Sequence, residues 1–265
     1  MPAVLEARRW PAKLVLQIVA TILVLPFLFP LVAMVEESLS GTGWNNYATV
    51  LAIPELPVFF RNSLIIAVVV IAVVYVCTMT AAFAFSKLQF RAKEFFFWLL
   101  LAALTLPEVV ILAPLFATAT SLGFYNTFIA VILPLAALQI PFTVLLARNF
   151  VDGIPNELID ASKVDGAGTW QGFRYVVWPL TMPIGAAIVV LTLIGTWNDY
   201  LLPLVFLQDP SLQTVTLVPS FFVGEFNNDQ TKVVAAAVVT AIPEIVAYLL
   251  LQRLFERGLS AGALK

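Results

Sequence analysis

The sequence predicts an all-α, polytopic membrane protein with six transmembrane helices, and three features of the chain support this fold class. Of its 265 residues, 61% are hydrophobic and only 11% are charged, a balance far from that of soluble domains. Long apolar stretches recur six times, and a helix needs about 20 apolar residues to cross a hydrocarbon core roughly 30 Å thick. The polar segments between the stretches are short, so little chain is left for a soluble domain.

Six apolar stretches define the expected helices, at about 14–35, 61–86, 95–119, 124–147, 181–207 and 233–254. The first follows the basic segment ARRWPAK and could be mistaken for a signal peptide. Its apolar run is about 22 residues long with no small-residue cleavage site after it, so we interpret it as a retained anchor. The expected organisation is an N-terminus, first helix and outer loop in 1–57, a core of five helices in 58–256, and a tail in 257–265.

Lysine and arginine fall almost entirely on one side of such a six-helix arrangement. With both ends inside, the cytoplasmic loops and ends hold Arg8, Arg9, Lys13, Lys87, Arg91, Lys93, Arg148, Lys163, Arg174, Arg253, Arg257 and Lys265. Only Arg61 and Lys232 fall outside. Because cytoplasmic loops carry the positive excess, we expect both termini to be cytoplasmic and the chain to lie in the cell (inner or plasma) membrane.

Composition argues against catalysis, metal binding and nucleic-acid binding by this chain. Histidine is absent and Cys77 is the only cysteine, which removes imidazole ligands, the commonest general base and any intrachain disulfide. The basic residues form no run or stripe. We therefore predict no catalytic residue, no metal site and no nucleic-acid partner, and we interpret Cys77 as an apolar filler.

The longest charged passage, NELIDASKVDGAGTW at 156–170, lies in the predicted cytoplasmic loop 149–180. Pro155, with Glu157 near the start and Lys163 near the end, predicts a short helix. Gly166 and Gly168 would end it and turn the chain, and Thr169 would cap a second short helix. The small Ala161 and Ser162 would let another surface approach closely. An ordinary interfacial loop and a docking element both remain open at this point.

This loop resembles the cytoplasmic loop of the permease subunits of binding-protein-dependent ABC importers. The signature has seven places, which this chain fills with Asp160, Ala161, Ser162, Gly166, Val176, Trp178 and Pro179. Ala161, Gly166 and Pro179 match the signature outright. Asp160, Ser162 and Val176 differ from it mildly. Trp178, where the family pattern has leucine, is the largest departure. RNSL, LGFYNT, VDGAG, TWNDYLLPL and QRLFERGLSAGALK occur in the order seen in the carbohydrate-type group, which is similar to the smaller maltose-transporter permease.

The resemblance implies a type I ABC importer permease fold and a division of labour among subunits. A second, homologous permease would complete the pathway, a dimer of cytoplasmic ATP-binding subunits would hold ATP and Mg, and an extracytoplasmic solute-binding protein would deliver the solute. No cofactor is expected on this chain, which lacks a glycine-rich loop followed by Lys and Ser or Thr. Coupling to the ATP-binding subunits would fall to Glu157, Asp160, Ala161, Ser162, Asp165 and Gly166.

Three carboxylates, Glu108, Asp199 and Glu244, lie within predicted helices, where such groups usually face a cavity or a partner. Glu108 and Glu244 each follow a proline and could instead serve backbone groups freed by a kink. Because sugars bind to aromatic faces and to amide or carboxylate groups, a translocation pathway is predicted at Trp197, Asn198, Asp199 and Tyr200. The alternative for these four residues is helix packing or an interfacial aromatic belt.

The outer segment 208–231 is longer than a connection between helices needs, and its middle is too apolar for a free loop. The resemblance implies contact with the docked binding protein, which we place at Gly224, Glu225, Phe226 and Asn227. A re-entrant cap over the chain's own helices is the alternative. The sequence does not name the solute: a carbohydrate-like solute is expected, a small polar solute such as glycerol phosphate is possible, and a secondary transporter is the remaining alternative.

Overall fold

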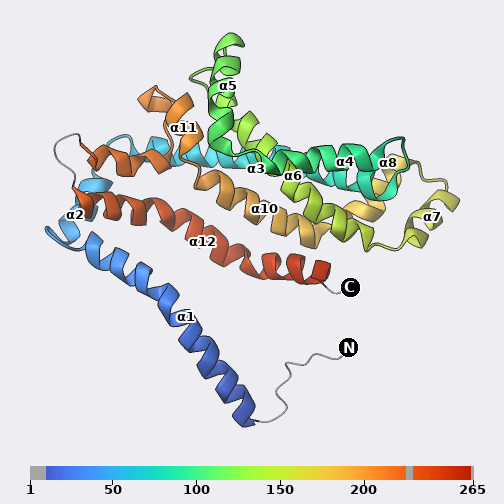
Figure 1. The fold of residues 1–265 in the computed structure, drawn as a ribbon, viewed down its shortest axis with the longest axis horizontal. Helices are drawn as coiled ribbons and strands as arrows, with labels where there is room; N and C mark the ends of the chain where they lie inside the picture. The colour runs from blue at the N-terminus through green and yellow to red at the C-terminus, as the bar shows by residue number, and fades with distance from the viewer. Residues whose placement is uncertain (1–9, 225–228, 264–265) are drawn as a thin grey trace. The chain divides into compact units, whose positions relative to one another are not determined.

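The computed structural model describes residues 10–224 and 229–263, almost all of them in helices or short connections (Figure 1). The elements are α1 Trp10–Ser38, α2 Trp44–Leu51, α3 Leu56–Lys87, α4 Lys93–Ala102, η1 Ala103–Thr105, α5 Glu108–Ser121, α6 Ile129–Asp152, α7 Asn156–Val164, α8 Thr169–Gln171, η2 Gly172–Val177, α9 Trp178–Leu180, α10 Met182–Trp197, α11 Leu201–Phe206, η3 Pro210–Leu212, η4 Val215–Phe222 and α12 Gln230–Ala263. The helical fold class is therefore confirmed.

Two of the six expected stretches are broken rather than continuous. The third consists of α4, η1 and α5, with a bend of 101° between Lys93–Thr105 and Glu108–Ser121. The fifth begins after a bend of 74° between Thr169–Leu180 and Met182–Trp197, and residues 198–200 separate α10 from α11. Pro107 explains the first bend, because proline cannot donate a backbone hydrogen bond and disfavours helical geometry in the residue before it.

By length and composition, four helices within the described ranges could cross a membrane, and the number rises to six if each bent pair forms one span. The continuous helices are Lys13–Ser38, Leu56–Lys87, Ile129–Asp152 and Gln230–Glu256. The expected positions of the six stretches are thus recovered, with the continuity of the third and the fifth corrected.

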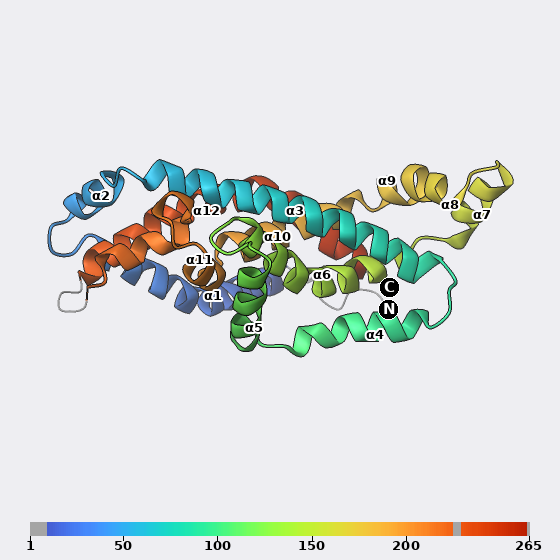
Figure 2. The ribbon, with the colours of Figure 1, turned by 90° about the horizontal axis from the view of Figure 1, so that it is seen from above.

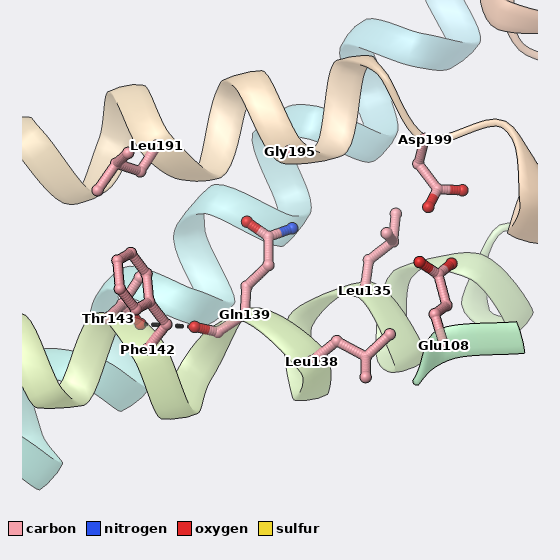
Figure 3. A pocket seen from close by; sticks show the side chains of 9 residues that line it. All are labelled: Glu108, Leu135, Leu138, Gln139, Phe142, Thr143, Leu191, Gly195 and Asp199. Atoms are coloured by element: carbon pink, nitrogen blue, oxygen red, sulfur yellow. Dashed lines mark hydrogen bonds between the residues drawn. The ribbon is translucent and has the colours of Figure 1, made fainter. Parts of the chain in front are cut away.

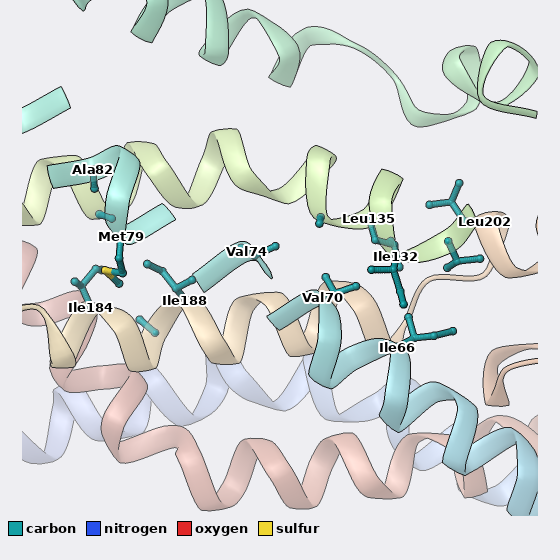
Figure 4. Packing of buried hydrophobic residues seen from close by; sticks show 14 of the residues in the cluster. Ile66, Val70, Val74, Met79, Ala82, Ile132, Leu135, Ile184, Ile188 and Leu202 are labelled. Atoms are coloured by element: carbon teal, nitrogen blue, oxygen red, sulfur yellow. The ribbon is translucent and has the colours of Figure 1, made fainter. Parts of the chain in front are cut away.

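The chain divides into two compact units, one made of the residues up to Ile53 with Val218–Val239, the other of Pro54–Leu217 with the residues from Thr240 onward. In the larger unit, α3, α6 and α10 run side by side (Figures 1 and 2). Their facing sides form an apolar core (Figure 4), which includes Ile66, Val70, Val74, Met79, Ala82, Ile132, Leu135, Ile184, Ile188 and Leu202.

Small and polar residues set how closely these three helices approach. Thr78 of α3 and Thr143 of α6 share a buried hydrogen bond of 2.7 Å between their hydroxyl groups. Gly185 of α10 lies against the ring of Tyr75, whose Oη would be only 2.8 Å from a Cβ at that position. Helices in membranes pack mainly through such close contacts and interhelical hydrogen bonds.

The smaller unit contains α1, whose most apolar window has no buried residues. Its exposed aliphatic and aromatic side chains suit contact with lipid or with another chain. Next to it, Asn46 of α2 donates its amide to the carbonyls of Ser38 and Ser40, both at 2.9 Å. These bonds satisfy carbonyl groups that the end of α1 leaves without helical partners.

The cytoplasmic location of the tail at 257–265 stays a prediction, and the structure adds its backbone conformation. Helix α12 continues to Ala263, so its backbone is helical through most of the predicted tail. Residues 264 and 265 lie outside the described ranges.

Candidate functional site

The predicted cytoplasmic elbow is a short helix beyond the ends of α3 and α6 (Figure 2). Helix α7 follows Pro155, carries Glu157 in its first turn and Lys163 in its last, and ends before Gly166. Gly166 has a φ of 82°, in the left-handed region that glycine occupies without strain. The predicted helix and its glycine stop are therefore confirmed.

The two faces of α7 differ in exposure. Val164 is 88% exposed, and Leu158 is 44% exposed, although both are apolar. Most of the residues predicted for coupling are also exposed, namely Glu157, Asp160 and Ala161 of α7 and Asp165 and Gly166 directly after it. Ser162 is instead half-buried, and its hydroxyl donates to the carbonyl of Ile159 at 2.7 Å.

The start of the elbow is bonded to helix α3 by a lysine whose role has no local signal in the sequence. The Nζ of Lys87, the last residue of α3, donates to the carbonyl of Ile154 at 2.6 Å and to Oδ1 of Asn156 at 2.9 Å. Ile154 immediately precedes the proline at the start of α7, and Asn156 is the first residue of that helix. One side chain thus holds the start of α7 against the end of α3.

A second group of contacts joins α3, α4 and α6 close to the same end of the larger unit. Arg148 forms two hydrogen bonds with Glu94, at 2.6 and 3.1 Å, and its guanidinium lies 3.9 Å from the ring centre of Phe97. Asp152 accepts a hydrogen bond from Ser86 at 2.5 Å. These contacts join α3, α4 and α6 to one another near the start of the elbow.

Two local predictions for the second half of the elbow need correction. Thr169 does not cap the second short helix, because it is the first residue of α8 and Gly168 occupies the cap. Gly168 also has an ordinary φ of −71°, and its N–H donates to the side chain of Gln171 at 2.8 Å. Trp178, the largest departure from the family pattern, packs edge-on against Tyr75 at 5.3 Å and Phe173 at 5.6 Å, so its larger ring fills space between helices.

A cavity of about 280 Å³ lies among α5, α6 and the end of α10 (Figure 3). Its lining residues are Glu108, Leu135, Leu138, Gln139, Phe142, Thr143, Leu191, Gly195 and Asp199. The carboxyl groups of Glu108 and Asp199 point toward one another, and the amide of Gln139 lies nearby. The sequence showed each carboxylate as a candidate but gave no sign that they meet.

The four residues predicted for the translocation pathway do not line one common site, because their side chains have different surroundings. Trp197 is buried and its indole donates to the carbonyl of Thr240 at 3.1 Å. Asn198 donates to Oε1 of Glu244 at 2.8 Å. Tyr200 is 40% exposed, and only Asp199 lines the cavity. Their role in transport stays a prediction.

Polar residues of two sequence motifs hold the start of the outer segment. Asn62, from RNSL, donates to the carbonyls of Ser211 and Gln213 at 2.8 and 2.9 Å. The side chain of Asn126, from LGFYNT, accepts the N–H groups of Gln208 and Asp209, both at 3.0 Å. These asparagines therefore fix the backbone where the chain leaves α11.

The outer segment also contains two short helices, η3 and η4. Hydrogen bonds from the hydroxyl of Ser211, and to a smaller extent from its backbone N–H, hold the pKa of Asp209 below its usual range. Of the residues predicted to contact a binding protein, Gly224 is exposed. Glu225, Phe226 and Asn227 lie outside the described residues.

Comparison with known proteins agrees with these features. The family model of the binding-protein-dependent transport system inner membrane component matches residues 75–261. The melibiose/raffinose/stachyose import permease protein MelC of Bacillus subtilis (strain 168) is 29% identical, with 98% of this chain and 100% of that protein covered. The lactose transport system permease protein LacG of Rhizobium radiobacter is 31% identical, over 82% of this chain and 78% of that protein.

A solved structure shares the fold. It is the crystal structure of a bacterial ABC transporter involved in the import of the acidic polysaccharide alginate, and one of its chains is 20% identical with a TM-score of 0.76. The match covers 96% of this chain and 99% of that chain. Because the family model spans most of the sequence, the chain belongs to the binding-protein-dependent transport system inner membrane components, the permease subunits of ABC importers.

Proposed function

We propose that this permease imports a carbohydrate-like solute as one half of a transmembrane pathway. A second, homologous permease forms the other half, and an extracytoplasmic solute-binding protein delivers the solute. Two cytoplasmic ATP-binding subunits hold ATP and Mg and hydrolyse the nucleotide, so this chain is not itself an enzyme. Relatives whose names specify melibiose, raffinose and lactose support a sugar over glycerol phosphate or another small polar solute.

The observation that carries the coupling role is the arrangement of α7, which presents an exposed mixed face while its start is tied to α3 by Lys87. A ligand-driven change in a partner shifts a conformational equilibrium only through contacts that differ between the two states. An exposed short helix fixed to long membrane helices provides such a contact. We therefore assign docking of an ATP-binding subunit to the exposed coupling residues of α7.

Exchange of a small residue on the exposed face tests this assignment. Ala161→Arg should prevent a stable complex with the ATP-binding subunits, because the large side chain would fill the space into which a partner packs. Ala161→Ser, which keeps the side chain small, should assemble and transport normally. Co-purification and ATP-dependent uptake by proteoliposomes measure both effects, and normal assembly of Ala161→Arg would refute the docking role.

The membrane orientation is a second part of the proposal. Both termini and the elbow face the cytoplasm, since this arrangement places nearly all lysines and arginines on the inner side. Single cysteines at Arg91, Asp165 and Asp229, introduced in a Cys77→Ala background, should separate the two sides. Only the third should react with an impermeant reagent added outside intact cells, and outside labelling at position 165 would overturn the orientation.

Contact with the binding protein is assigned to residues 224–227. A Gly-Ser linker in their place should lower transport stimulated by the binding protein while the complex still assembles. If the variant fails to assemble, these residues serve as a structural cap over the permease. If it transports at the normal rate, they make no contact that matters for delivery.

A further inference from the structure

The cavity among α5, α6 and α10 receives polar side chains from three separate segments. Glu108 is the first residue of α5, Gln139 lies in the middle of α6, and Asp199 follows the end of α10. Figure 3 shows the two carboxyl groups facing one another across one end of the space. The side-chain amide of Gln139 donates to the hydroxyl of Thr196 at 3.1 Å, which fixes its position beside the cavity.

Both carboxylates lie where a membrane helix is interrupted. Glu108 directly follows the break of 101° at Pro107, and Asp199 lies between α10 and α11. Non-helical backbone at membrane depth is tolerated where it is buried in protein or lines a polar cavity. Interrupted helices of transporters place their solute sites at such breaks. The backbone geometry therefore favours a ligand-binding role independently of the acidic side chains.

The two carboxyl groups interact with one another, but the hydrogen bonds around them leave part of the pair unsatisfied. One oxygen of Asp199 accepts the N–H of Leu202 at 3.1 Å. Oε1 of Glu108 is buried and accepts no hydrogen bond within the described residues. None of the nine residues that line the cavity is basic. A buried carboxyl oxygen without a donor is costly, so a ligand that brings O–H donors would remove this cost.

We propose that the cavity is a subsite for the hydroxyl groups of the transported carbohydrate, with Glu108 and Asp199 as the acceptors. Leu138 and Phe142 supply apolar wall for the carbon face of the ring. Small-molecule pockets span about 300–1,000 Å³, so a cavity of about 280 Å³ suits one sugar ring rather than a whole oligosaccharide. This inference rests on the proposed function and adds a solute contact on this subunit.

Protection of a cysteine placed in the cavity wall tests the subsite directly. The complete importer is purified with Leu138→Cys in a Cys77→Ala background and labelled with N-ethylmaleimide. The probe is whichever of melibiose, raffinose and lactose the wild-type complex imports. That sugar should slow labelling of the introduced cysteine. The native Cys77, labelled in an otherwise unchanged complex, should react at the same rate with and without sugar.

Isosteric amides then test the acceptors. A hydrogen bond to a charged group contributes about 1.5–3 kcal/mol, so Glu108→Gln or Asp199→Asn should raise the sugar concentration for half-protection about tenfold or more. Glu55→Gln, the same chemical change just before α3, should leave it unchanged. Equal protection in Glu108→Gln and the unsubstituted complex would overturn the subsite.

The outcomes also separate this proposal from the function on which it rests. A complex that imports sugar yet gives no protection refutes the subsite and leaves the importer function intact. A complex whose ATP hydrolysis responds to none of the three sugars refutes their assignment as solutes, and the subsite argued for them falls with it.

Discussion

We expect the hydrogen bonds of Lys87 to transmit movement of the elbow helix α7 to the membrane helix α3. Lys87→Met keeps the length and apolar stem of the side chain but removes the donor to Ile154 and Asn156. Ile154 is buried, and leaving a buried acceptor unsatisfied costs about 1–3 kcal/mol. A loss of that size changes the ratio of the state in which α7 is held against α3 to the state in which it is detached by about 5–150-fold.

Two measurements report this loss. Hydrogen exchange in the reconstituted complex should become faster at the backbone amides of α7, while the central amides of α3 and α6 keep their protection. Solute-stimulated ATP hydrolysis should fall, because closure of the ATP-binding subunits would move the elbow without moving α3. ATP binding by the isolated ATP-binding subunits should not change.

Lys93 provides a matched control from the same end of the larger unit. Its Nζ donates to the carbonyls of Ser86 and Leu88 at 3.4 and 3.1 Å, at the end of α3 and just after it. Lys93→Met removes the same charge and should leave exchange at α7 unchanged. If the two methionine variants behave alike, net charge at this end explains the effect and the specific tie is refuted.

Three further changes have defined outcomes. Gly166→Val should abolish uptake while the ATP-binding subunits still bind ATP, because a β-branched residue at a φ of 82° is strained by about 1 kcal/mol or more and redirects the elbow; normal uptake would contradict this. Removing residues 258–265 should lower solute-stimulated ATP hydrolysis without preventing membrane insertion, and unchanged stimulation would leave the tail without a role in coupling. Gly185→Val should lower the thermal midpoint of the purified complex, because overpacking against Tyr75 costs about 1–3 kcal/mol; an unchanged midpoint would show that the ring moves aside freely.

The sequence predicted those parts of the fold that depend on local chemistry. The apolar runs gave the positions of the helices, and the order Pro155, Glu157, Lys163 and Gly166 gave the elbow with its stop. These signals act within one helix turn of the residues that produce them. The breaks inside the third and fifth stretches are harder to predict. The mean hydropathy of a window long enough to detect a membrane helix hardly changes at a single proline, and membrane helices tolerate kinks.

Contacts between distant segments could not be predicted from one sequence. Nothing local indicates that Glu108 faces Asp199 or that Lys87 reaches Asn156. Such pairs depend on how α3, α6 and α10 pack, which small residues such as Gly185 set through close approach. The letters RNSL and LGFYNT likewise do not indicate that Asn62 and Asn126 bond to the backbone of the outer segment.

The scarcity of polar residues in this chain makes each of their positions informative. At one end of the larger unit, Asn62 and Asn126 bond to backbone groups and hold an irregular segment in place. At the other, Lys87 bonds to a carbonyl and to a side chain at the start of α7. Such groups have structural partners and are accounted for by them. Glu108 differs, because one of its oxygens is buried without a donor beside the carboxyl group of Asp199. In a membrane interior such a group is costly to keep, so the cavity between these carboxylates is where substitution should change solute handling more than folding.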